Sequence, residues 1–66
     1  MAVAKVVEIN AASEKSFEDA ISAGIAKAGE TVRNIRGAWV KEQQVTVDNG
    51  KISEYRVDLK VSFVLE

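Results

Sequence analysis

The sequence predicts an α+β fold in which an antiparallel sheet and one helix follow the order β-α-β-β. Three observations predict it: a period-two alternation near the carboxyl end, a helical repeat of apolar residues from Phe17, and a hairpin signal at Asp48-Asn49-Gly50-Lys51. No internal repeat, low-complexity run or linker divides the chain. We therefore expect residues 1–66 to form a single domain.

The first strand is expected over Val3 to Ile9, where valine and isoleucine alternate imperfectly with charged residues. Small and polar residues from Asn10 to Lys15 then predict a loop.

A helix of about five turns is expected to follow, with Ser16 as its N-cap and Asp19 in its first turn. One side carries apolar residues at helical spacing: Phe17, Ile21, Ile25, Ala28, Val32 and Ile35. Gly24 lies on this side at a cost of about 1 kcal/mol relative to alanine, which close contact with the sheet would explain. We expect Arg36 and Gly37 to end the helix.

The second and third strands are expected to form a hairpin. The second runs from about Gly37 to Asp48, and the third runs from Lys51 to Glu66, with a two-residue type I′ turn at Asn49-Gly50 between them. In the third strand polar residues alternate with an apolar series, which is Tyr55, Val57, Leu59, Val61, Phe63 and Leu65. That series predicts one dry face, which the helix must cover.

Pairing Asp48 with Lys51 predicts the register of the hairpin. Two pairs then lie on the dry face, Val40–Leu59 and Ala38–Val61. Three pairs lie on the opposite, polar face: Trp39–Lys60, Lys41–Asp58 and Gln43–Arg56. Trp39 is therefore an aromatic side chain among charged ones.

Near the turn the apolar pattern changes face, because Val45, Val47 and Ile52 fall on the side of Trp39 in this register. A β-bulge near Glu42 to Gln44 would reset the phase. Alternatively, the hairpin tip extends beyond the helix and is covered by another subunit. We favour the second interpretation, because a domain of this size has only one helix to offer.

Composition narrows the function classes. The chain has 66 residues and contains neither Cys nor His, so disulfides and the usual zinc, haem and iron-sulfur ligand sets are missing, and oligomerisation is the expected reinforcement. Nine basic and ten acidic residues give no footprint of a nucleic-acid or membrane partner. No phosphate-binding loop or nucleophile arrangement is visible, so we do not expect an enzyme. We expect a soluble cytoplasmic protein.

The chain resembles the dodecins along nearly its whole length. The resemblance is carried by Lys5-Val6-Val7-Glu8-Ile9, Ser16-Phe17-Glu18-Asp19-Ala20, Glu30-Thr31-Val32-Arg33-Asn34-Ile35 and Val61-Ser62-Phe63-Val64-Leu65. It implies a three-stranded antiparallel sheet partly wrapped around one helix, and a hollow homo-dodecamer built from trimers. It also implies binding of a flavin, FMN or riboflavin, or of calcium in a flavin-free branch, whose metal ligands do not transfer to residues here.

The flavin-binding pattern of that family is altered in two places. The position of the Trp that stacks on the flavin is Gly37 here, and that of a Gln on the third strand is Arg56. Trp39 lies two residues further on, one pleat along the same face. The candidate cofactor-binding residues are Trp39, Gln43, Arg56 and Lys60. Trp39 either stacks on a ligand or is buried between subunits, and the charged residues around it also fit a solvated cross-strand pattern.

Overall fold

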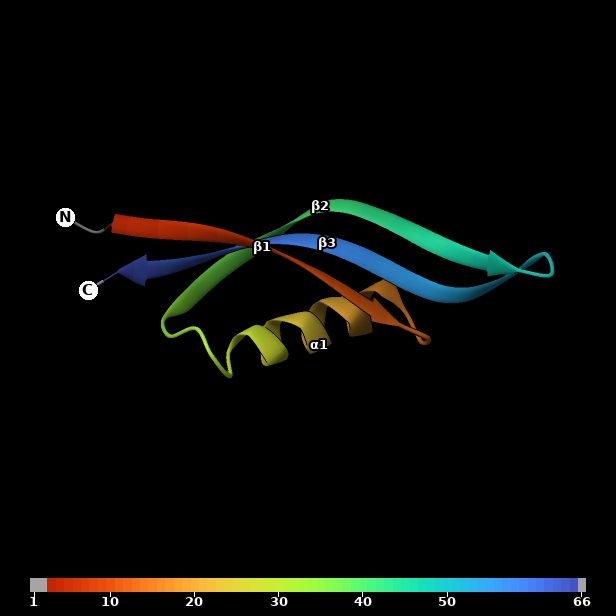
Figure 1. Ribbon diagram of the computed structural model, residues 1–66, viewed down its shortest axis with the longest axis horizontal. Helices are drawn as coiled ribbons and strands as arrows, with labels where there is room; N and C mark the ends of the chain where they lie inside the picture. The colour runs from red at the N-terminus through yellow and green to blue at the C-terminus, as the bar shows by residue number, and fades with distance from the viewer. Residues whose placement is uncertain (1–2, 66) are drawn as a thin grey trace.

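The computed structural model describes residues 3–65 and has four elements in the order β-α-β-β (Figure 1). They are β1 (Val3–Ser13), α1 (Phe17–Ala28), β2 (Ile35–Asp48) and β3 (Lys51–Leu65). The order confirms the predicted fold, and Glu66, which we expected to end the third strand, lies outside the described residues. Among the described residues, no helix is long and apolar enough to span a bilayer.

The strands form one antiparallel sheet in the order β1-β3-β2. The strand β3 therefore lies in the middle, with its hairpin partner β2 on one side and β1 on the other. The helix packs on one face of this sheet, against β1 and β3. Its contact with the sheet buries Ala20, Val57, Leu59 and Val61 almost completely. The dry face predicted for the third strand is therefore the face that α1 covers.

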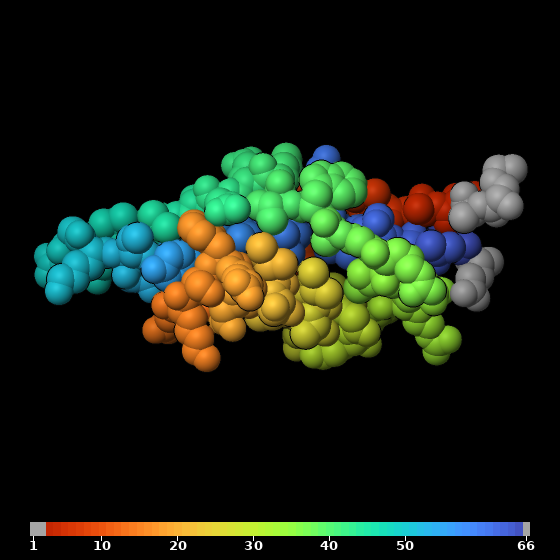
Figure 2. Space-filling view, turned by 180° about the vertical axis from the view of Figure 1, so that it is seen from behind, coloured from red at the N-terminus to blue at the C-terminus, as the bar shows by residue number. Residues whose placement is uncertain are grey.

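The helix covers only the middle of a long, narrow molecule, whose extents are 51 × 19 × 13 Å. Figure 2 shows the hairpin end of β2 and β3 projecting past the helix on one side, and the start of β1 with the end of β3 projecting on the other. Phe17 and Tyr55 make an edge-to-face contact, with ring centroids 5.2 Å apart, where the helix begins. From there to its turn the hairpin has no helix over it (Figure 1).

The helix begins as predicted, because the Ser16 side chain accepts a hydrogen bond from the Asp19 backbone N–H at 3.0 Å. It ends at Ala28 rather than near Ile35, so the expected five turns were wrong. Gly29 caps the helix, and Asn34 then adopts a φ of 63°, which redirects the chain into β2. Ile35 still reaches the core, but it does so as the first residue of a strand.

The first strand is longer than predicted and continues through Asn10 to Ser13, where a loop was expected. Its continuation is paired with β3, from Asn10–Asp58 to Ser13–Tyr55. The Ser13 hydroxyl then donates a hydrogen bond of 2.6 Å to the Asp19 carboxylate, which joins the end of β1 to the first turn of α1. Small side chains at the end of β1 therefore mark close packing beside the helix instead of a loop.

The hairpin confirms part of the predicted register. Asn49 and Gly50 have φ values of 56° and 76°, as a type I′ turn requires, and Trp39–Lys60, Val40–Leu59 and Ala38–Val61 pair as expected. The predicted pairs Lys41–Asp58 and Gln43–Arg56 were wrong. The register shifts by one residue at Lys41, so the next pairs are Glu42–Asp58, Gln43–Val57 and Gln44–Arg56.

The shift at Lys41 is a β-bulge. It is the explanation that we did not favour for the change of face of the apolar residues near the turn. It pairs Val45 with Tyr55, which faces the helix, and thereby returns Val45 to the helix side. A second shift, at Ser53, restores the predicted pair Val47–Ile52 at the tip. These two side chains remain 60% and 52% exposed, so the tip is uncovered within one chain and its contact with another subunit stays a prediction.

Candidate functional site on the outer face of the sheet

The face of the sheet turned away from α1, called the outer face below, carries most of the predicted site residues. Across its centre, three residues stand in one row, because Lys60 of β3 pairs with Glu8 of β1 and with Trp39 of β2. Trp39 is 50% exposed although it is the bulkiest side chain of the protein. A half-exposed indole beside an ammonium group offers a flat apolar surface next to a positive charge.

Beside Trp39 the outer face has a position without a side chain, which is Gly37. Gly37 and Ser62 are paired, and the Ser62 hydroxyl donates a hydrogen bond of 3.2 Å to the Gly37 carbonyl oxygen. Ser62 also pairs with Val6 of β1, which is 45% exposed. A flat molecule placed against Trp39 would thus lie over backbone and small side chains, with no second aromatic ring at Gly37.

Further toward the hairpin tip, Arg56 is held by two neighbours. Its guanidinium donates hydrogen bonds of 2.8 Å to the Glu54 carboxylate and to the Asn10 side-chain oxygen. Beside it is a shallow hollow of about 80 Å³, lined by Asn10, Glu42, Gln44, Arg56, Val57 and Asp58. Arg56 is therefore fixed in position and partly neutralised by Glu54.

The structure brings some of the four predicted site residues together and separates others. Trp39 and Lys60 are adjacent, whereas Arg56 lies four residues along β3 from Lys60, roughly 13 Å away. Gln43 is on the opposite face, because the bulge at Lys41 pairs it with the buried Val57. Gln44, which the sequence reasoning passed over, takes its place on the outer face; only the position of the bulge could have indicated this.

Two carboxyl groups interact between Trp39 and the hollow. A hydrogen bond from Asp58 lowers the pKa of Glu8, and nearby Lys41 acts in the same direction, with its Nζ 3.4 Å from the Glu8 carboxylate. The same hydrogen bond to Glu8 raises the pKa of Asp58. Within residues 3–65 no three carboxylates meet in a way that could hold a metal ion.

The charges of the outer face nearly balance. Between the Trp39–Lys60 pair and the Thr46–Glu54 pair it carries four acids, which are Glu8, Glu42, Glu54 and Asp58, together with the bases Lys41, Arg56 and Lys60. Lys41 and Arg56 are each in an ion pair with an acid, at 3.4 and 2.8 Å. Lys60 has no carboxylate partner within ion-pair distance among the described residues, so it is the cation best placed to meet a ligand beside Trp39.

A family model described as dodecin matches residues 3–66. The dodecin of Thermus thermophilus is 41% identical over 64 residues, which is 97% of this chain and 93% of that protein. The calcium dodecin of Mycobacterium tuberculosis is 44% identical over 64 residues, or 96% of this chain and 89% of that protein.

Solved structures agree with these similarities. A crystal structure of a variant of the Thermus thermophilus dodecin matches with a TM-score of 0.94 at 39% identity, covering 100% of this chain and 98% of the other. The Mycobacterium tuberculosis calcium dodecin, described as having a novel calcium-binding site, matches with a TM-score of 0.83 at 42% identity, covering 97% and 91%.

Proposed function

The chain belongs to the dodecin family, and we propose that it is a non-catalytic flavin-binding protein that holds FMN or riboflavin on the outer face of its sheet. We further propose that it stores or sequesters the flavin in the cytoplasm as a homo-dodecamer built from trimers. A chain this small gains stability by assembling, because among residues 3–65 of one copy only four hydrophobic side chains are almost completely buried.

The observation that carries this proposal is the position of Trp39. Its indole is half exposed on a face where its direct neighbour, Lys60, is charged. An aromatic side chain in such surroundings gains from stacking against a flat ring, which contributes about 0.5 to 1.5 kcal/mol beyond the burial of area. Because Gly37 offers no aromatic side chain, Trp39 is the residue that we expect to stack on the flavin ring.

The flavin ring should matter more than the phosphate for affinity. Lys60 can reach a phosphate oxygen near Trp39, whereas Arg56 is already bonded to Glu54 and Asn10. Glu8 is paired across the sheet with Lys60 and reduces the local positive charge. We therefore expect FMN to bind more tightly than riboflavin at low salt, where the contact between Lys60 and the phosphate is not screened, and with similar affinity at physiological salt.

A second candidate function is a flavin-free shell that binds calcium or is purely structural. It is favoured by Gly37 and Arg56, which replace the two residues expected to contact a flavin, and by the similarity to a calcium dodecin. The outer-face acids Glu8, Glu42 and Asp58 would then have to be completed by another copy of the chain.

The absorbance spectrum of the freshly purified protein, recorded with its native mass, separates these functions. Flavin absorption bands from a large oligomer are expected. A colourless oligomer that takes up no added flavin, and whose melting temperature rises with calcium, would replace the first function by the second.

A further inference from the structure

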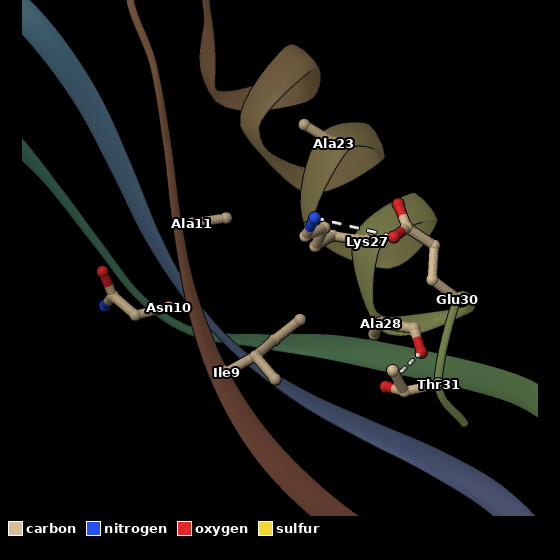
Figure 3. A pocket seen from close by; sticks show the side chains of 9 residues that line it. Ile9, Asn10, Ala11, Ala23, Lys27, Ala28, Glu30 and Thr31 are labelled. Carbon is tan, nitrogen blue, oxygen red and sulfur yellow. Dashed lines mark hydrogen bonds and ion pairs between the residues drawn. The ribbon is translucent and has the colours of Figure 1, made fainter.

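A groove of about 580 Å³ lies between α1 and β1 (Figure 3), on the face of the sheet that α1 covers, whereas Trp39 lies on the outer face. The side chains of Ile9 and Ala11 point from β1 toward the helix, where Ala23 and Gly24 complete an apolar lining of mostly small residues. Lys27 and Glu30 form an ion pair of 3.5 Å at the same groove. An apolar groove with one charge of each sign suits an apolar segment flanked by opposite charges.

The groove also runs along a free strand edge. Because the sheet order is β1-β3-β2, β1 has a strand partner on one side only among residues 3–65. The backbone groups on its other side border the groove and can pair with an added extended segment, which supplies the hydrogen bonds that an apolar groove cannot. A strand from another chain therefore fits this groove better than a compact ligand does.

The hairpin tip of the same protein has the matching chemistry. Val47 and Ile52 face each other across the tip and are 60% and 52% exposed. Asp48 and Lys51 flank them, one of each charge, as Lys27 and Glu30 do at the groove. The tip cannot reach the groove of its own chain, because it projects past the start of the helix while the groove lies along its later turns, roughly 20 Å away (Figure 1).

We propose that the hairpin tip of one copy docks in the α1/β1 groove of a second copy, with Val47 and Ile52 against Ile9, Ala11 and Ala23. Tip and groove are different surfaces of one chain, so each contact leaves a further tip and a further groove to be filled. Repetition of this contact closes into a ring when the rotation between copies allows it, as the proposed homo-dodecamer built from trimers requires, and otherwise continues as a filament. The inference rests on the assembly in the proposed function and is independent of the flavin.

Cysteine cross-linking tests the contact directly, because the chain has no cysteine of its own. A disulfide needs Cα atoms within about 7 Å, so the double variant Ala23→Cys with Val47→Cys can cross-link only between copies. We expect mild oxidation to link it into species larger than a dimer, whereas each single variant stays unlinked. The matched control pairs Val47→Cys with Ala26→Cys, an exposed helix position outside the groove lining, and should stay unlinked.

Light scattering on the same samples separates failure of this contact from failure of the assembly. An oligomer that stays unlinked, or links equally through Ala26→Cys, overturns the proposed contact and leaves the oligomer standing. A single variant that links efficiently to itself also overturns it, because a like-to-like contact would then be present. A stable monomer contradicts both the contact and the proposed assembly.

Discussion

A hydrogen bond links the carboxyl groups of Glu8 and Asp58 on the outer face of the sheet, where the two residues lie on neighbouring strands, two residue pairs apart. The arrangement lowers the pKa of Glu8 from its ordinary 4.5 and raises the pKa of Asp58 from its ordinary 3.8. The surrounding charges are Lys41 and Lys60, which favour the ionised form, and Glu42, which opposes ionisation of Asp58. Above both pKa values the proton is gone and two like charges face each other.

The pair predicts a specific dependence of stability on pH. The contribution of Asp58 is complete below its unfolded pKa and is lost as the pH rises through its raised folded value. Glu8 acts in the opposite direction, since its contribution is present above its unfolded pKa and is lost as the pH falls through its lowered folded value. The pair is thus most favourable with one proton, at about pH 4.

Asp58→Asn keeps a hydrogen-bond donor to Glu8 and removes one charge. We expect it to raise the melting temperature at pH 7, with a gain that disappears toward pH 4. Glu14→Gln, at an exposed position after β1, is the control and should show no such trend. A gain for Asp58→Asn of equal size at both pH values would contradict the shared proton.

Two glycines of the helical segment should respond oppositely to alanine. At Gly24 a Cβ would lie 2.9 Å from the Cβ of Ala11, so we expect Gly24→Ala to lower stability by about 1 to 3 kcal/mol despite the better helix propensity of alanine. Gly29 has φ −65° and ψ −15°, and its nearest contacts would be 3.4 Å or more, so Gly29→Ala should be neutral or stabilise by up to about 1 kcal/mol. Chemical unfolding at equal protein concentration compares the two. Equal effects would show that the contact between Gly24 and β1 is loose.

Val47→Asp should break the assembly while a single chain keeps its fold. The side chain is 60% exposed in one copy, so the charge costs little there, but burying it unpaired against a neighbour costs several kcal/mol. Ala26→Asp adds the same charge at an exposed helix position and should leave the native mass unchanged. If Val47→Asp has the wild-type mass and melting temperature, the tip faces water.

Lys60 should make the binding of FMN depend on salt. Its ammonium group stands beside Trp39 and can contact the ligand phosphate, whereas riboflavin has no phosphate to contact. Raising the ionic strength should weaken FMN binding and change riboflavin binding little, and Lys60→Gln should remove this difference. The same salt dependence in Lys60→Gln would place the phosphate elsewhere.

The sequence predicted those parts of the fold that depend on local pattern. Asn49 and Gly50 adopt the positive φ values that their turn requires, and the Trp39–Lys60 pair predicted from that turn is present because the extra residues at Lys41 and Ser53, one on each strand, offset each other. The end of the helix was missed because Val32 and Ile35 continue the helical spacing past Ala28. Asn34, with its positive φ, redirects the chain into β2. The spacing of apolar residues does not reveal the effect of a single residue of this kind.

The candidate site was predicted only in part, because its polar end depends on one bulge. An extra residue at Lys41 moves Gln43 to the helix side and puts Gln44 beside Arg56. A bulge and an extension beyond the helix fit the same sequence pattern. In both cases the apolar residues change from an even position, Val40, to odd positions, Val45 and Val47. Here the bulge is present and the tip also extends past the helix, whereas its contact with another subunit stays a prediction.

The most direct test of the proposed site is a titration of flavin into the apo protein, followed by quenching of flavin fluorescence, for wild type, Trp39→Phe and Trp39→Ala. We expect the wild type to bind flavin and Trp39→Phe to lose little affinity. In Trp39→Ala the dissociation constant should rise by about 2- to 12-fold from the lost stacking, at unchanged native mass. Equal binding by wild type and Trp39→Ala would contradict Trp39 as the platform. If neither binds and Trp39→Ala loses its oligomer, Trp39 is an interface residue and the flavin function is wrong.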